Sequence, residues 1–219
     1  MPNLSRRDFL GTTASGVAAL MAFPPAVLGA TRKKIPIGVQ LYSVGSAANA
    51  DLPETLAGIK RMGYEAVEFA GYYGKDAKTL RQLLDYHGLK CCGTHIGLNT
   101  MVGDALAKTV EFNLTLGNKN LVVPSLRARS IDDWIKHAET FTEIAEKLKP
   151  HNMRAGYHNH TAEFKPIDGQ IPEDVFFGKA AKEVFLQLDI GHGVHGGADP
   201  IAYMKKFAGR VLTVHVKEY

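Results

Sequence analysis

Strand-like and helix-like segments alternate along this chain, and no two strand-like runs follow each other directly. Amphipathic stretches with helical spacing separate seven short apolar runs. The predicted strands are residues 35–42, 66–69, 89–97, 120–123, 153–157, 184–188 and 211–216. Because antiparallel neighbours are joined by short hairpins and parallel neighbours need a crossover, the alternation predicts a parallel sheet with helices packed against it.

The helix-like stretches carry start and stop signals at their ends. Asp51 and Ser130 stand where N-cap residues are expected, and Gly63, Gly88 and Gly117 follow three of the stretches as C-terminal stops. The predicted helices are residues 53–61, 77–87, 104–116, 131–149, 172–181 and 200–207. These local signals support the order of elements that the hydrophobic pattern predicts.

Two parallel architectures fit this order, an open doubly wound sheet and a (β/α)₈ barrel. A doubly wound sheet usually has a glycine-rich phosphate loop after its first strand, and residues 43–47 lack that glycine spacing. In a barrel, polar residues gather at the carboxyl ends of many strands, which is the pattern described below. We therefore predict an α/β fold of the (β/α)₈ TIM-barrel type over residues 31–219.

The predicted barrel lacks one strand-helix unit. A (β/α)₈ barrel has eight strands and typically about 250 residues. This chain has 219 residues and seven predicted strands, and it ends directly after the last of them. An unclosed barrel would expose a sheet edge and part of its core. We expect a C-terminally incomplete barrel with about seven of its strands in this sequence.

The N-terminal segment has the order of features expected of an export peptide. Arg6 and Arg7 form a twin-arginine pattern, residues 11–23 are apolar and small, and Ala30 ends a small pair that suits cleavage. The apolar stretch is too short and too weak for a stable membrane span. We predict a twin-arginine signal peptide over residues 1–30, a periplasmic location and no membrane span in the mature protein. An ordinary amphipathic N-terminal helix is the alternative.

Charge and cysteine content narrow the classes of partner. The formal net charge is +4, and removing the predicted signal peptide leaves +3 because it takes away two arginines and one aspartate. A charge this weak and dispersed does not favour binding to nucleic acid or to an anionic membrane. The adjacent Cys91 and Cys92 would form a strained disulfide, so we expect them to be small packing residues.

Polar clusters lie at the ends of four of the predicted strands. They are Gly93-Thr94-His95, His158-Asn159-His160, Leu188-Asp189-Ile190-Gly191-His192 and His215-Val216-Lys217-Glu218. Burying imidazoles and carboxylates without partners is costly, so their repetition at the same end of several parallel strands indicates one shared site. Imidazole nitrogen and carboxylate oxygen are ligands of divalent metals. The pattern predicts a metal-dependent enzyme that acts on a sugar-like polyol.

The clusters after the last two strands supply the central pair of candidates. Asp189 ends an apolar strand, where a cation would stabilise it, although it could also cap the following loop or helix. His192 follows one short turn later, in a glycine-rich stretch that lets the backbone approach a ligand. His215 and Lys217 share one face of their strand, so His215 could ligate the metal and Lys217 could hold a substrate oxygen. A fraying strand end is the alternative for this pair.

The remaining candidates come from the earlier strands. His158 lies at the end of its strand and Glu163 follows shortly after, so either could reach the metal. His95 is a single histidine at a strand end, and a surface histidine without a role is the alternative. Glu68 is a carboxylate on an apolar strand, where it would bind substrate hydroxyls or pair with Lys217.

Five segments resemble one known family. The stretches GVQLYS, VEFAG, YHNH, LDIGH and HVKE are similar to those of the xylose isomerase-like TIM barrels, which include sugar phosphate isomerases and epimerases. The resemblance runs from residue 35 to residue 219. It implies a divalent metal (manganese, cobalt, magnesium or zinc) at the carboxyl-end mouth of the barrel. It also implies proton transfer beside the carbonyl of a sugar.

The resemblance also implies roles for individual residues. Asp189 and His215 match the metal-binding Asp and His of the family, and His158 stands where many relatives have a ligating Glu. The family's second ligating Glu belongs to an eighth strand, which this sequence lacks. The predicted sets are the metal ligands His158, Asp189 and His215, the substrate-binding residues Glu68, His95, His192 and Lys217, and the catalytic residues Glu163 and Lys217.

Three other functions share these features. A dehydratase of keto-inositols or related ketoses would use the same motifs. An apurinic endonuclease also has histidines at strand ends, but it would need a basic DNA-binding face. A non-catalytic exported sugar-binding domain, or an inactive fragment, would bind without turnover. We expect a small-molecule sugar or polyol partner and no nucleic acid, and the choice between a monomer and a homo-oligomer stays open.

Overall fold

The structure is a computed structural model that describes residues 35–218. From Pro36 onwards these residues belong to one compact unit. The predicted signal peptide, residues 1–30, lies outside the described residues and stays a prediction. Within the described part of the chain, no helix is both long and apolar enough to cross a membrane.

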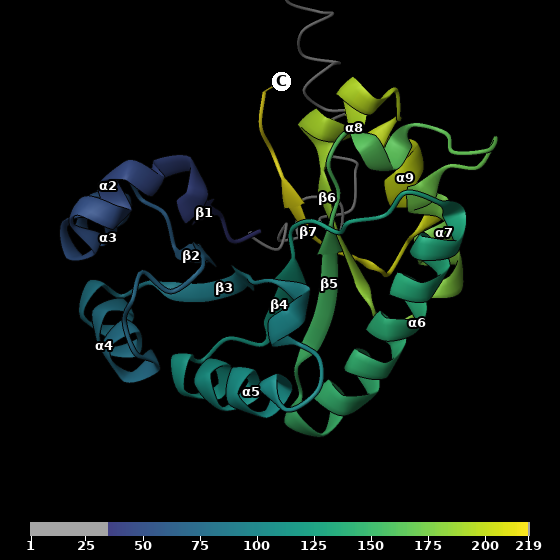
Figure 1. Cartoon of the computed structure of the whole chain (residues 1–219). Coiled ribbons are helices and arrows are strands. Elements are labelled where there is room, and N and C mark those ends of the chain that lie inside the picture. Colours follow the sequence, from purple (N-terminus) through teal and green to yellow (C-terminus); the bar gives the residue numbers. More distant parts are fainter. Residues whose placement is uncertain (1–34, 219) are drawn as a thin grey trace, which may run out of the picture. The chain divides into compact units, whose positions relative to one another are not determined.

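Seven parallel strands form one curved sheet, in which the spatial order follows the order along the chain (Figure 1). Every neighbouring pair is parallel, as the alternation of strands and helices predicts. Across residues 35–218, β1 and β7 are the two edges, so the sheet is an open half-barrel. The strands are β1 (Gly38–Gln40), β2 (Ala66–Ala70), β3 (Lys90–His95), β4 (Asn120–Val123), β5 (Arg154–His158), β6 (Phe185–Asp189) and β7 (Val211–His215).

Helices follow the strands and pack on the outer face of the sheet (Figure 1). The α-helices are α2 (Gly45–Ala50), α3 (Leu52–Arg61), α4 (Ala77–His87), α5 (Ala105–Leu116), α6 (Ile131–Leu148), α7 (Pro172–Lys179), α8 (Ile190–Gly196) and α9 (Pro200–Lys206). Short 3₁₀ segments are η2 (Leu41–Val44), η3 (Leu98–Thr100), η4 (Lys149–His151) and η5 (Ala162–Phe164).

The predicted helix signals act as expected. The side chain of Asp51 accepts a hydrogen bond from the Glu54 backbone N–H at the start of α3. Ser130 and Asp133 form a reciprocal capping box at the start of α6. Gly88 ends α4 in the left-handed region with φ of 61°, a conformation that costs a glycine little.

Two segments differ from the sequence prediction. The predicted strand 35–42 is reduced to the three residues of β1, because the chain turns into η2 directly after Gln40. The Gln40 side chain accepts a hydrogen bond from the Tyr42 N–H, which satisfies that donor within the turn instead of in the sheet. The glycine-rich stretch after Asp189, for which the sequence analysis predicts no element, folds into helix α8 because Asp189 caps its first turn.

The apolar core lies between the outer face of the sheet and the helices. Aromatic rings on α6, β5 and α7 form its densest part, where Phe176 contacts both Phe141 and Tyr157 with ring centroids 5.0 and 5.2 Å apart. All three rings are fully buried. Cys91 and Cys92 are both free, in agreement with the expectation that they form no disulfide. Burial raises the pKa of the Cys92 thiol to about 12, so it is an unreactive packing group.

Close packing between β5 and β6 gives a first testable prediction. A methyl group at Gly156 would lie 2.4 Å from the ring of Phe185, which has no room to move because Phe185 is itself buried. We expect Gly156→Ala to lower the free energy of unfolding by about 1–3 kcal/mol. The matched control is Gly178→Ala on α7, where a methyl group meets open space. Because alanine favours helix over glycine, this change should raise stability by about 0.5–1 kcal/mol. Urea unfolding of both variants would measure this, and equal stabilities would contradict it.

Candidate metal centre

The inner faces of five strands carry polar side chains to one end of the half-barrel. Strand alternation points Tyr157 and Leu188 into the outer core, and it points their neighbours His158 and Asp189 to the inner face. The pairing register places Asp189 opposite His215 on β7. The predicted shared site therefore exists as a geometric cluster of side chains from β2, β3, β5, β6 and β7.

Three histidines form the centre of the cluster. His95, His158 and His215 each offer one ligand atom, and these atoms all lie within 4.8 Å of one another. Their ring centroids are 4.7 to 5.5 Å apart. Two of the three, His158 and His215, belong to the predicted metal set, whereas His95 was predicted to bind substrate. The arrangement adds His95 as a third imidazole able to hold a metal.

Asp189 joins the cluster through one carboxylate oxygen. Its Oδ2 lies 3.9 Å from His158 Nε2 and 4.0 Å from His215 Nδ1, so the predicted convergence of Asp189 with His215 is present. Its Oδ1 accepts a hydrogen bond of 2.8 Å from the His192 backbone N–H and so caps α8. The sequence left a choice between a capping and a metal-facing role. In the structure Oδ1 caps the helix, and Oδ2 faces the histidines.

Glu68 lies behind two of the histidines. Its carboxylate accepts hydrogen bonds from His215 Nε2 at 2.6 Å and from Gln187 Nε2 at 2.7 Å. Gln187 in turn accepts from His95 Nε2 at 2.6 Å. Burial by itself raises the pKa of the Glu68 carboxyl, but the hydrogen bond from His215 and the nearby imidazoles outweigh it and lower the pKa. Glu68 is therefore an anion that orients imidazoles, and it does not form the contact with Lys217 offered as one alternative.

The glycine at position 93 makes room for that carboxylate. A methyl group at Gly93 would lie 2.7 Å from Glu68 Oε1. Glu68 is held by hydrogen bonds from His215 and Gln187, so it could not move aside freely. The lack of a side chain at Gly93 therefore leaves the space that the Glu68 carboxylate occupies.

The protonation state of the histidines suits a metal. Burial lowers the pKa of both His95 and His158, so their imidazoles are neutral near pH 7, the form that ligates metals. Within the described part of the chain, the buried Nδ1 of His158 has no hydrogen-bond partner. His95 and His215 each donate Nε2–H to a partner oxygen, so the Nδ1 atom of each ring remains for a metal. Ligating histidines commonly show this pattern. These residues therefore fit a divalent cation.

A second group of polar side chains lies beside the cluster, towards solvent. Lys217 Nζ donates to His192 Nε2 at 3.0 Å and lies 3.9 Å from Asp189 Oδ2. The other nitrogen of His192, Nδ1, is 3.2 Å from the Thr161 hydroxyl. The Lys217 side chain is 44% exposed, so it is accessible to a small molecule. The structure thus brings the predicted residues His192 and Lys217 together at the edge of the metal cluster.

Glu163 lies apart from the cluster. Its carboxylate accepts hydrogen bonds from the Tyr157 hydroxyl and from the His160 backbone N–H, and the side chain is buried. Since Tyr157 is on the outer face of β5, this carboxylate faces the core rather than the histidines. Its predicted catalytic role stays a prediction, and it would require Glu163 to leave these partners.

Two residues of the site, Gln187 and Gln40, were missed by the sequence analysis, and Asn159 was named in a polar cluster without a role of its own. Gln187 connects His95 to Glu68, Gln40 donates to Glu68 Oε2 at 2.9 Å, and the Asn159 side chain bonds to the backbone of Asp189. For Gln187 a signal existed, because it lies two residues before Asp189 and so shares its face of the strand. For Gln40 and Asn159, only the tertiary structure reveals the partner.

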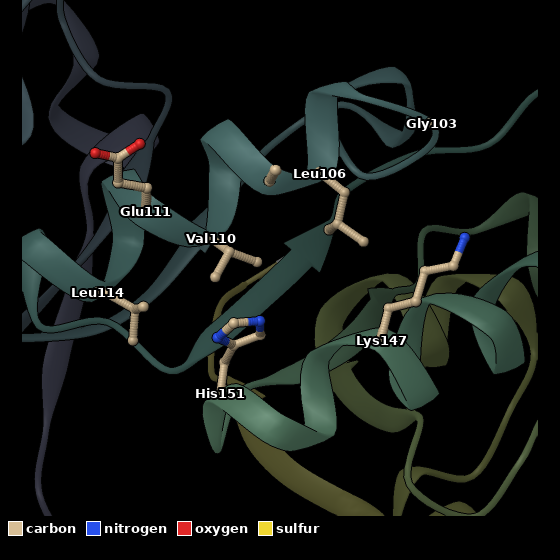
Figure 2. Close-up of a pocket in the computed structure, with 8 residues that line it drawn as sticks. Gly103, Leu106, Val110, Glu111, Leu114, Lys147 and His151 are labelled. Atoms are coloured by element: carbon tan, nitrogen blue, oxygen red, sulfur yellow. The ribbon is translucent and has the colours of Figure 1, made fainter.

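A pocket of about 530 Å³ lies elsewhere, between α5 and the end of α6. Figure 2 shows Leu106, Val110 and Leu114 on one side of it and Lys147 and His151 on the other. None of the predicted site residues lines this pocket, and its walls are mainly apolar side chains. It does not contribute to the metal cluster.

Comparison with known proteins gives relatives of moderate similarity. The chain is 25% identical over 191 residues to the rhizopine catabolism protein MocC of Rhizobium meliloti, covering 76% of this chain and 57% of that protein. It is 25% identical over 178 residues to an inosose dehydratase of Lacticaseibacillus casei, covering 71% of this chain and 59% of that enzyme. The chain thus spans a little under three fifths of the length of these curated relatives.

A solved structure is similar over more of its length. A sugar phosphate isomerase/epimerase from Parabacteroides distasonis superposes with a TM-score of 0.76 at 25% sequence identity, covering 87% of this chain and 80% of that one. The family model described as xylose isomerase-like TIM barrel matches residues 56–219. The chain therefore belongs to the xylose isomerase-like TIM barrel family, the family of the sugar phosphate isomerases and epimerases.

Proposed function

We propose that this protein is a divalent-metal-dependent isomerase or epimerase of a sugar or sugar phosphate. The observation that carries the proposal is the cluster of three histidines, two of them with lowered pKa values, with Asp189 Oδ2 within 4.0 Å of two of the rings. The similarity to the sugar phosphate isomerase/epimerase of P. distasonis supports the reaction class.

The residues that would hold the metal are His95, His158 and His215, together with Asp189. A divalent cation bound there supplies a Lewis acid that polarises a carbonyl and stabilises negative charge on its oxygen. Glu68 and Gln187 hold two of the imidazoles in place through their Nε2–H groups, as outer partners of ligating histidines do.

The substrate would lie beside Lys217 and His192. The Lys217 ammonium would hold a hydroxyl or carbonyl oxygen of the sugar by charge-assisted hydrogen bonding. His192 accepts from this ammonium and keeps it near Asp189, so Lys217 is also the group best placed to deliver a proton at the mouth. Glu163 is the second proposed acid–base group, and to act it would exchange its hydrogen bond with Tyr157 for one with substrate.

A dehydratase acting on a keto-inositol is the second candidate. It is favoured by the similarity to inosose dehydratases, which cover about seven tenths of this chain. Loss of water from a polyol ketone begins with the same removal of a proton beside a carbonyl, so the same cluster would serve it. A sugar-binding domain without turnover is the third candidate.

We also propose that the protein acts outside the cytoplasm. The proposal rests on the twin-arginine pattern at Arg6 and Arg7 and on the apolar stretch that follows it. A small-molecule sugar or polyol of the periplasm would then be the substrate.

Turnover in heavy water tests the function. The protein would be stripped of metal, reloaded separately with manganese, cobalt, magnesium or zinc, and incubated with a panel of ketoses, ketose phosphates and keto-inositols. An isomerase or epimerase adds deuterium beside the carbonyl without loss of water, whereas a dehydratase gives a product lighter by one water. We expect deuterium incorporation only after metal loading. Sugar binding without incorporation or water loss, with or without metal, would contradict the proposal and favour the binding domain.

A further inference from the structure

The side chain of Asn159 makes a two-point contact with the backbone of Asp189. The Asn159 amide nitrogen donates to the Asp189 carbonyl at 3.1 Å, and its amide oxygen accepts from the Asp189 N–H at 2.9 Å. The two bonds fix the orientation of the carboxamide, because a flipped amide would place donor against donor and acceptor against acceptor. Asn159 is fully buried, so water cannot replace it in this contact.

This contact extends the pairing of β5 with β6 beyond the end of the backbone ladder. The last backbone pair of the two strands is His158 with Gln187. A carboxamide presents an N–H donor beside an acceptor oxygen, so Asn159 pairs with the carbonyl and the N–H of Asp189 as a further strand residue would. Aspartate in this place lacks the donor, alanine lacks both groups, and glutamine is longer by one methylene.

The contact restrains the residue whose side chain faces the histidines. With its backbone held by Asn159 and its Oδ1 held by the His192 N–H, Asp189 has one carboxylate oxygen left to point at His158 and His215. Oδ2 occupies that position, within 4.0 Å of both rings. A free aspartate would lose rotamer freedom on binding a cation, whereas this one is already ordered.

We infer that Asn159 is a positioning residue of the metal centre, which orders Asp189 Oδ2 for the cation before the cation binds. The inference rests on the proposed metal-dependent function and adds to it a residue that touches neither metal nor substrate. Asn159 also joins the segment that carries His160 and Thr161 to the start of α8, so it holds the two sides of the mouth together.

Cobalt binding tests the inference, since Co²⁺ reports both affinity and ligand geometry through its visible absorption. We expect Asn159→Ala to weaken Co²⁺ binding by about 10–100-fold, the range seen when an outer partner of a metal ligand is removed. The visible band should also shift, because Asp189 is no longer held. The matched control is Asn118→Ala, which removes an equally buried amide that donates to Thr94, Asn113 and the backbone of Asn120. This control should keep the wild-type spectrum.

The possible results separate the inference from the function on which it rests. Wild-type affinity and spectrum in Asn159→Ala, or equal losses in both alanine variants, would overturn the positioning role while leaving the metal centre intact. A wild-type chain that binds no Co²⁺ would overturn both. If Asn159→Ala does not fold, Asn159→Asp keeps the acceptor for the Asp189 N–H and puts a carboxyl oxygen in place of the donor that faces the Asp189 carbonyl. An unchanged Co²⁺ spectrum and affinity in that variant would again overturn the inference.

Discussion

Replacing His158 by alanine should remove tight metal binding and, with it, metal-dependent turnover. His158 forms one corner of the triangle of imidazoles, with ring centroids 5.0 Å from His95 and 4.7 Å from His215. Its pKa is lowered by burial and its Nδ1 lacks a hydrogen-bond partner in the described part of the chain, so nothing else in the fold uses that nitrogen. We expect metal affinity to fall by more than about 100-fold, which is the upper end of the loss caused by removing an outer partner of a ligand.

The measurement is a Co²⁺ titration of the metal-free protein, followed by the heavy-water assay. The matched control is His151→Ala, since His151 is an exposed histidine of η4, which precedes β5 and so lies at the opposite end of that strand from His158. The control should bind and turn over as the wild type does. Folding of His158→Ala would be checked by circular dichroism, and His158→Gln would serve as a polar substitute of similar volume if the alanine variant is unstable. Stoichiometric, tight Co²⁺ binding by a folded His158 variant would show that the three histidines do not form the metal site.

The free energy of unfolding of the metal-free variant should change much less than its metal affinity does. Removing a buried imidazole with an unsatisfied nitrogen relieves a desolvation cost, although the cavity left behind offsets part of the gain. Loss of a metal ligand should lower metal affinity far more than it lowers the stability of the metal-free protein. Loss of a packing residue should lower that stability instead.

Local sequence signals predicted most of the fold. The cap at Ser130 and the stop at Gly88 act within one helix turn, so they could be recognised without knowledge of the partners of that helix. The exceptions are β1 and α8. In both, one side chain, Gln40 or Asp189, accepts a hydrogen bond from a nearby backbone N–H and so starts a helical turn. The hydrophobic pattern predicted a continuing strand after Gln40 and no element after Asp189.

The site was predicted less completely than the fold. The order of strands correctly brought Asp189 and His215 to the same edge of the sheet, because the carboxyl ends of parallel strands lie together. It could not show that Glu68 is 2.6 Å from an imidazole 147 residues later in the chain, or that Glu163 turns towards Tyr157. Those contacts depend on the curvature of the sheet and on how η5 packs, which no pattern within a single segment encodes.

Replacing Glu173 by glutamine should remove a fall in the free energy of unfolding that the wild-type protein shows as pH rises above 4.5. Glu173 on α7 is fully buried, and neither carboxylate oxygen has a hydrogen-bond partner among the described residues. Burial raises its pKa well above the ordinary value of 4.5, and the negative charges of Glu163 and Asp174 raise it further. The folded protein therefore keeps the proton of this carboxyl to a higher pH than the unfolded chain does.

The direction of the pH effect follows from proton linkage. Between pH 4.5 and the raised pKa, the unfolded chain has lost the Glu173 proton and the folded chain has kept it. The folded state then binds more protons, so stability falls as pH rises, by up to about 1.4 kcal/mol per pH unit. Glutamine has nearly the same shape and does not titrate, so Glu173→Gln should lack this fall. Below pH 4.5 the two proteins should differ by a constant.

Urea unfolding of both proteins at several pH values from 4 to 8 would measure the difference. The readout is the change of the stability difference with pH, and not its value at any one pH, because a buried amide also carries unsatisfied groups whose cost does not vary with pH. The control is Glu146→Gln on α6, an exposed carboxylate that should give a difference independent of pH. If the Glu173→Gln and wild-type curves run parallel from pH 4 to 8, Glu173 titrates alike in both states. The carboxyl would then have found water or a proton donor inside the fold, and the core beside Tyr157 would be wetter than its packing indicates.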